Sequence, residues 1–298
     1  MPKRISLVFT LLLATVMLIR PASASTLALS NWHANGSQMW RINFPGYNNA
    51  MPANQKTDLG VSELTYPQSG TYASVTYDIP LSSSHKISLD AGTLGAFSSA
   101  TGTDSDWDYS RSKELWHYGT FQTDGTSTFI NLDFKHMLAN NTEFFYGYGY
   151  SNSQYVMTQG YYSVLDYAAV DLPLPTLHST YSIAYHGPHV GLTGTKQLAP
   201  KLALVGSFSY SPLVLVQGHG IWNLRNLDFR HFGTGQMLDG KIALHYAIAG
   251  RRDNALILGY RYQYYSLYTG SENTSNQITW TKATKLQHGW YMGGEFSF

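Results

Sequence analysis

The 298-residue chain contains no cysteine, and charged residues make up only 12% of it. Without cysteine, the chain has no disulfide framework, zinc–thiolate site or thiol nucleophile. Its 19 basic residues nearly balance its 18 acidic ones, so the basic excess of a nucleic-acid-binding protein is also missing. A soluble domain usually carries about 25% charged residues. The low charge therefore indicates a protein that exposes apolar surface or sits in lipid.

Long apolar runs are scarce as well. One lies near the start, at residues 5–19, after a basic N-terminus and before the small-residue sequence 22–24 (Ala-Ser-Ala). This arrangement predicts a secretory signal peptide over residues 1–24, which leaves a mature domain at 25–298. No later run approaches the ~18 residues that a helical membrane span requires. The sequence thus excludes a helical span after residue 24.

Aromatic residues are abundant, with 23 Tyr, 13 Phe and 7 Trp. Many of them alternate with polar residues, as in the segments 71–79, 130–138, 256–264 and 290–298. A period of two predicts β-strands. A soluble β-sandwich also alternates, but Tyr and Trp at strand ends, charges on the polar face and a terminal Phe favour a membrane barrel. We expect an all-β fold, a transmembrane antiparallel β-barrel of about ten strands.

The connections between the predicted strands alternate in length. Short polar connections occur near 80–86, 138–143, 196–202 and 249–254, and long ones near 44–60, 97–125, 156–180, 212–240 and 266–284. In outer-membrane barrels the short turns face the periplasm and the long loops face outward. Any chemistry in the long connections should therefore gather at one extracellular rim.

Two carboxylates stand out in the second long connection, at Asp104 and Asp106. Residues at i and i+2 of an extended segment share a face. Such a pair holds a water, binds a cation or shares a proton, although an ordinary solvated turn has the same pattern. Among the eleven histidines, His219 lies on the same predicted rim and is the first candidate for a general base; His117 and His231 are its rivals.

Other catalytic patterns are missing. None of the eleven histidines is followed two residues later by serine, as in the His-x-Ser element in which histidine activates the serine of barrel lipases. The chain also has no phosphate-binding glycine loop and no His-Glu-x-x-His.

Several stretches resemble the omptin family, the outer-membrane endopeptidases of Gram-negative bacteria. They run in colinear order over most of the mature chain, at 60–64, 103–107, 147–155, 188–194, 208–211 and 293–298. The resemblance implies an aspartic-type endopeptidase, a peptide or protein substrate, an active rim facing outside, and no cofactor or nucleic-acid partner.

The family uses two aspartates facing an Asp–His couple, which activates the attacking water. Carried over by position, the resemblance implies that Asp104 and Asp106 form the first pair and that His219 is the histidine. Here the chain departs from the family, because the Asp-x-His element reads Gln217-Gly-His. Glutamine accepts a hydrogen bond but does not stabilise an imidazolium, and Asp228 is a possible substitute.

A second departure concerns lipid. Omptins generally need lipopolysaccharide held by basic residues, and two such positions are Gln154 and Ala184 here, which leaves activation by this lipid open. Two alternatives to an endopeptidase also stay open. One is an omptin-fold barrel without catalysis, whose Tyr-rich loops bind host or envelope molecules as an adhesin. The other is a small porin.

Overall fold

The computed structural model describes residues 25–44, 60–109, 113–139, 141–248, 254–275 and 278–298. The expected signal peptide at 1–24 lies outside these residues. Within them the chain is almost entirely β-strand, apart from a short 3-10 helix, η3 (Asn223–Arg225). No helix in this part of the chain is both long and apolar enough to cross a membrane.

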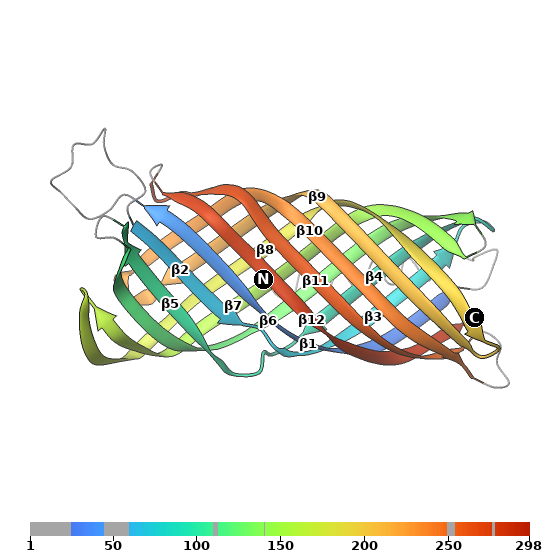
Figure 1. Cartoon of the computed structure of the whole chain (residues 1–298), viewed down its shortest axis with the longest axis horizontal. Coiled ribbons are helices and arrows are strands. Elements are labelled where there is room, and N and C mark those ends of the chain that lie inside the picture. The colour runs from blue at the N-terminus through green and yellow to red at the C-terminus, as the bar shows by residue number, and fades with distance from the viewer. Residues whose placement is uncertain (1–24, 45–59, 110–112, 140, 249–253, 276–277) are drawn as a thin grey trace.

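The strands form one closed antiparallel sheet (Figure 1). In chain order they are β1 (Thr26–Phe44), β2 (Gly60–Pro67), β3 (Gly70–Pro80), β4 (His85–Leu94), β5 (Ala100–Asp108), β6 (Glu114–Ala139), β7 (Thr142–Leu165), β8 (Ala168–Ala199), β9 (Leu202–Trp222), β10 (Leu227–Ala247), β11 (Ala255–Glu272) and β12 (Thr279–Ser297). β12 pairs with β1 and closes the ring. Both β2 and β3 pair with β1, and both β4 and β5 pair with β6, so the sheet has ten positions around the ring. The predicted barrel of about ten strands is confirmed.

Side chains alternate between the lumen and the outer wall, as the period of a β-strand requires. In β1, Trp32, Gln38 and Trp40 are buried in the lumen, whereas Leu29 and His33 face outward. A shift of one residue in any strand would therefore exchange its lumen and outer sets.

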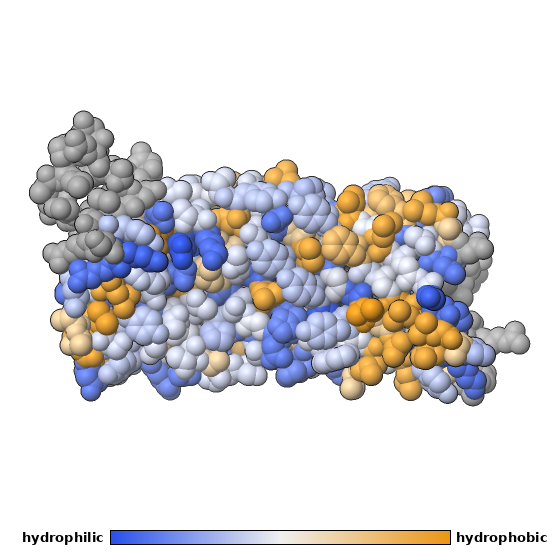
Figure 2. All heavy atoms as spheres, viewed as in Figure 1, coloured by the Kyte–Doolittle hydropathy of each residue, from blue (hydrophilic) through white to orange (hydrophobic). Residues whose placement is uncertain are grey.

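Apolar residues of the outer wall gather toward the end of the barrel that carries the short turns, the right-hand end in Figure 2. They include Leu29, Leu132, Leu192, Phe208, Ile242, Leu244, Leu256, Leu258 and Met292. An outward apolar zone of this kind is the part of a barrel that contacts lipid. On β1 the next outward residues along the strand are Asn31, His33 and Asn35. The barrel wall thus becomes polar toward the other end, beyond the membrane-spanning zone.

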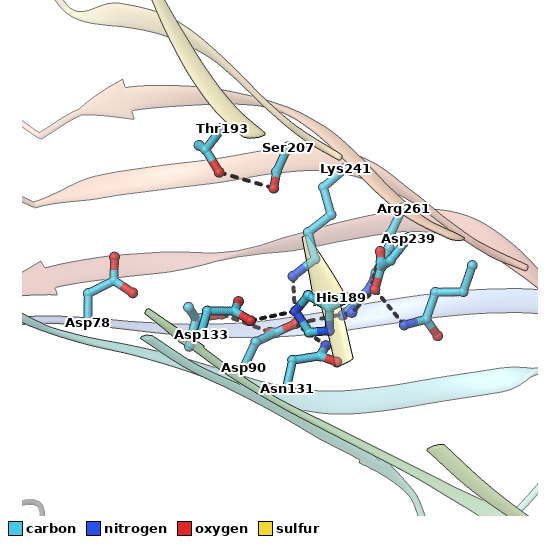
Figure 3. A network of polar contacts seen from close by, with 12 residues as sticks. Asp78, Asp90, Asn131, Asp133, His189, Thr193, Ser207, Asp239, Lys241 and Arg261 are labelled. Atoms are coloured by element: carbon cyan, nitrogen blue, oxygen red, sulfur yellow. Dashed lines mark hydrogen bonds and ion pairs between the residues drawn. The ribbon is translucent and has the colours of Figure 1, made fainter. Parts of the chain in front are cut away.

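Packed side chains fill the middle of the lumen. Trp32 stacks on Tyr72 with ring centroids 4.9 Å apart, and the guanidinium of Arg261 lies 4.1 Å from the Phe129 ring centroid. Arg261 also bridges Asp239 and Asp90 in the polar network of Figure 3. A cavity of about 590 Å³ lies on the turn side of this layer, and one of about 390 Å³ lies toward the other end. The two have no lining residue in common, because the packed layer separates them.

Much of the sequence expected as long connections is strand instead. β6 begins at Glu114, inside the expected connection 97–125. β7 and β8 leave only Asp166 and Tyr167 between them, inside the expected connection 156–180, and this hairpin projects at the left of Figure 1. These strands lie beyond the apolar zone, so their outward residues face water and the apolar alternation that marks a strand in sequence is weak there.

Candidate active site

The two aspartates singled out from the sequence lie together at the end of the barrel away from the short turns. Strand β5 places Asp104 and Asp106 between β2 and β6. Both line the 390 Å³ cavity, as their i and i+2 spacing predicts. Its other walls come from β1, β10, β11 and the η3 tip, and include Trp40, Phe229, Arg225, Trp222 and Glu272. The site is therefore assembled from strands on opposite sides of the ring.

Asp104 is half-buried, with its Oδ1 fully buried, beside a second carboxylate. Burial, and then the charge of Asp106, raise the pKa of Asp104 well above its usual 3.8, while Arg225 acts in the opposite direction. The Oδ1 atoms of Asp104 and Asp106 are both buried without a hydrogen-bond partner among the described residues. Two carboxyl groups in this state favour sharing one proton, because both cannot ionise cheaply at close range.

His117, one of the two rival histidines, adjoins this pair. It is the register partner of Asp106 on β6, and its Nδ1 lies 3.4 Å from Asp106 Oδ2. That Nδ1 is buried and makes no hydrogen bond within the described chain. The Nε2 of His117 lies 3.3 Å from Asp166 Oδ1, and the imidazole stacks on Trp116 with centroids 4.0 Å apart. His117 thus stands between two carboxylates, with one nitrogen directed at the aspartate pair.

His231, the other rival, lies beneath the opposite wall. Its Nε2 is 2.9 Å from Glu272 Oε2, its Nδ1 is 3.1 Å from the Tyr181 hydroxyl, and it stacks on Trp280. Burial lowers the pKa of His231 and outweighs the opposing effect of Glu272. A neutral imidazole accepts from Tyr181 and donates to Glu272. Both nitrogens are therefore occupied, and Glu272 is the member of this couple that lines the cavity.

His219, the histidine that the family resemblance favours, is on the outer wall. Its neighbours Gly218 and Gly220 face the lumen, where an added Cβ would meet the Tyr181 hydroxyl and the Phe229 ring respectively. Strand alternation then turns His219 and Gln217 outward, and 42% of the His219 side chain is exposed. Its Nε2 lies 3.0 Å from Asp228 Oδ1. Asp228 does reach His219, but the structure does not bring this couple together with Asp104 and Asp106.

Gln154 and Ala184, the positions compared with the family's lipid-binding residues, are also on the outer wall. Ala184 lines a hollow of about 570 Å³ together with Gln217, His219 and Arg230. Gln154 is exposed on β7, opposite Ser182 of β8. No basic residue stands at either position, and the one arginine that lines the hollow, Arg230, belongs to β10.

Sequence reasoning missed two carboxylates, Glu272 and Asp166. Glu272 is 41 residues from His231, and Asp166 is 49 residues from His117. No short motif joins residues at such separations. For His219 the sequence does hold one local signal, the glycines on either side of it. Because Gly218 and Gly220 face the lumen, the residue between them faces outward.

Comparisons with known proteins support the fold. No protein-family model matches the chain, and no curated protein sequence matches it. The chain is similar to the crystal structure of the outer membrane protease OmpT from Escherichia coli, with a TM-score of 0.75 over 93% of this chain and 97% of that one, at 15% identity. The translocator domain of the autotransporter NalP from Neisseria meningitidis has a TM-score of 0.37 over 96% of this chain and 92% of that one, at 11% identity. The first likeness shows that this chain has the fold of an outer-membrane β-barrel.

Proposed function

We propose that this protein is a cell-surface endopeptidase of the outer membrane, which hydrolyses peptide bonds in the cavity lined by Asp104 and Asp106. One observation carries the proposal: Asp104 Oδ1, Asp106 Oδ1 and His117 Nδ1 are all buried without a hydrogen-bond partner in the described residues. A buried polar atom left unpaired costs about 1–3 kcal/mol. We propose that a water or a substrate group bound beside the aspartate pair supplies the missing partners.

In the proposed reaction, the aspartate pair holds a water against the scissile carbonyl. His117 Nδ1 takes a proton as the water oxygen bonds to the carbonyl carbon, and the same proton then passes to the amine as the C–N bond breaks. The proton that the pair shares, which the raised pKa of Asp104 favours, donates a hydrogen bond to the developing oxyanion. The aspartate pair thus positions the water and stabilises the oxyanion, His117 carries the proton, and protons and electron pairs balance.

The choice of histidine follows from position. His117 is directed at Asp106 from the neighbouring strand, whereas His219 lies on the outer wall. The histidine that the resemblance implies is therefore replaced in this proposal by one of its rivals. The family's Asp-x-His element is then not needed, and Gln217 does not abolish catalysis.

Two further observations support a peptidase over the alternatives. The fold is similar to that of an outer-membrane protease. The packed layer around Arg261, Trp32 and Phe129 fills the lumen, which disfavours a porin. The position of the apolar zone near the short turns, for its part, favours a cavity that faces outside the cell.

The test is cleavage of a quenched fluorescent peptide library by the refolded protein, with and without lipopolysaccharide. We expect cleavage by the wild type, a loss of about 10²-fold or more in Asp106→Asn and in His117→Gln, and unchanged activity in the outer-wall control His219→Gln. Retained cleavage in His117→Gln together with loss in His219→Gln would reverse the choice of histidine. The arm with lipopolysaccharide decides whether this lipid activates the protein.

The second candidate is a surface binding or adhesion protein without catalysis. It is favoured by the aromatic walls of the cavity, to which Trp40, Trp116, Trp222 and Phe229 contribute. No cleavage of any peptide by the wild type, combined with saturable quenching of tryptophan fluorescence by the same peptides, would establish this function instead.

A further inference from the structure

We infer that Asp166, in the two-residue turn between β7 and β8, is a positioning residue for His117. The inference rests on the proposed function, in which His117 is the general base. Asp106 comes from β5 and His117 from β6. Asp166 adds a third element to the site, the hairpin of β7 and β8.

The contacts of Asp166 are centred on one oxygen. Its Oδ1 accepts a hydrogen bond from Trp116 Nε1 at 3.0 Å and lies 3.3 Å from His117 Nε2. Trp116 and His117 are consecutive residues, which in a regular strand would point to opposite faces. Here their rings stack at 4.0 Å with an interplanar angle of 25°. One carboxylate oxygen thus holds two neighbouring rings on the same side of the sheet.

A β-bulge explains how the two rings share a side. In the β5–β6 register, Asp106 pairs with His117 and Trp107 pairs with Leu115, so Trp116 is an extra residue on β6. A bulge locally breaks the alternation and re-aims a side chain, and bulges are frequent next to active sites. The bulge is therefore what brings the Trp116 ring over the imidazole and within reach of Asp166.

The turn that carries Asp166 is itself tied to both neighbouring strands. Asp166 and Tyr167 have left-handed backbone angles, with φ of 50° and 67°, as a two-residue hairpin turn of type I′ requires. The Tyr167 N–H donates to the Trp116 carbonyl oxygen at 3.1 Å, and the Tyr167 hydroxyl donates to Asp108 Oδ2 at 2.6 Å. A bulky residue in this backbone region is unfavourable, so these bonds offset its conformational cost and fix the place of Asp166.

The chemical consequence is a defined tautomer. A carboxylate at Nε2 keeps the proton on that nitrogen, so Nδ1 carries the lone pair that the general base needs. This Nδ1 is the nitrogen near Asp106. The negative charge of Asp166 also favours the imidazolium formed during the reaction. The Asp166 side chain is 76% exposed, so solvent screens its charge, and the effect should be smaller than the ~10⁴-fold seen for a buried orienting aspartate.

The test compares Asp166→Asn with Asp171→Asn, a matched control on the exposed part of the same hairpin. In Asp166→Asn we expect kcat to fall about tenfold with KM within about twofold, and the acid limb of the kcat/KM profile to move to lower pH. Asp166→Glu should recover part of the loss. Asp171→Asn should match the wild type in all three measurements. An unchanged pH profile in Asp166→Asn would overturn the inference, even if kcat fell.

A second measurement separates this inference from the proposed function. In protein labelled with ¹⁵N-histidine, with His117→Gln used for assignment, the wild type should show His117 protonated at Nε2. Asp166→Asn should move the signal toward the Nδ1-protonated form, because an asparagine N–H can donate to Nε2. This result requires no enzymatic activity. If the tautomer is the same in both proteins, Asp166 does not position His117, whether or not the wild type cleaves peptides.

Discussion

Asp106 and His117 face each other across the β5–β6 ladder, with Asp106 Oδ2 3.4 Å from His117 Nδ1. The contact joins a carboxylate of the cavity to the histidine that directly follows the bulged residue Trp116 on β6. Sequence distance gives no hint of it, since the two residues come from different strands. It also distinguishes His117 from the other ten histidines of the chain, because this is the histidine in contact with Asp106 among the described residues.

The Trp116 bulge provides a direct test of this geometry. Deletion of Trp116 would make the β5–β6 ladder regular, with Leu115 directly before His117, and would remove the indole that Asp166 holds beside the imidazole. We therefore expect a folded barrel whose peptidase activity has fallen at least tenfold. Trp116→Phe keeps the residue count and an aromatic ring at this position while it loses the indole N–H, and should retain activity within a few-fold of the wild type. Equal activity in the deletion variant and the wild type would show that the bulge has no role.

Replacement of Gln217, which lies beside His219 on the outer wall, should not change peptidase activity. The omptin family, which the sequence resembles, has an aspartate at the position of Gln217. If this difference had abolished activity, Gln217→Asp would restore it. Because Gln217 and His219 lie on the outer wall, we expect Gln217→Asp to leave the peptide cleavage rate unchanged. The measurement is initial rate on the best library peptide. A rate at least tenfold higher in Gln217→Asp would show that residues 217 and 219 act in the cavity.

Asp104 should make folding stability depend on pH. Its raised folded-state pKa means that the folded chain holds a proton which the unfolded chain releases near 3.8. Stability therefore falls as pH rises from this value through the raised pKa, and the loss remains at higher pH. Asp104→Asn should raise the urea midpoint at about pH 7.5 and match the wild type near pH 4. A lower midpoint at neutral pH would show that Asp104 is ionised and stabilising in the folded protein.

The His231–Glu272 couple should matter for stability. Glu272→Ala leaves the buried Nε2–H of His231 without its acceptor, so we expect a loss of about 1–3 kcal/mol in the free energy of unfolding. The double variant His231→Phe, Glu272→Leu removes the couple and leaves only the Tyr181 hydroxyl without its acceptor, so it should recover part of that loss. Urea unfolding followed by tryptophan fluorescence measures both. If the double variant is as unstable as Glu272→Ala, shape rather than the polar contact decides the stability.

The packed lumen predicts that the protein does not conduct ions. Arg261 lies against Phe129 and Trp32 and bonds to Asp239 and Asp90. In planar bilayers we expect the wild type to show no stable channel above background. The matched variant Arg261→Ala, Phe129→Ala, which empties part of the layer, should show measurable conductance. A steady conductance of the wild type would instead favour the porin.

The sequence by itself determined the fold class and the place of the aspartate pair. Alternation with period two is a local property, so strands, a barrel and the shared face of Asp104 and Asp106 follow from neighbouring residues. The short connections were also clear, because turn residues interrupt the alternation. The strand extensions at 114–125 and 156–180 were not evident from the sequence. Their outward residues face water, so apolar and polar residues do not alternate clearly there.

Only the tertiary structure decided which histidine belongs to the site. Position in a loop suggested His219, but its direction depends on strand parity, and Gly218 and Gly220 occupy the lumen face on either side of it. The contact between His117 and Asp106 depends on register, and that between His117 and Asp166 depends on a bulge and a turn 49 residues away. Register and bulges are set by pairing between distant segments. The types of residue in the site are therefore readable from the chain, while their partnership is a property of the closed barrel.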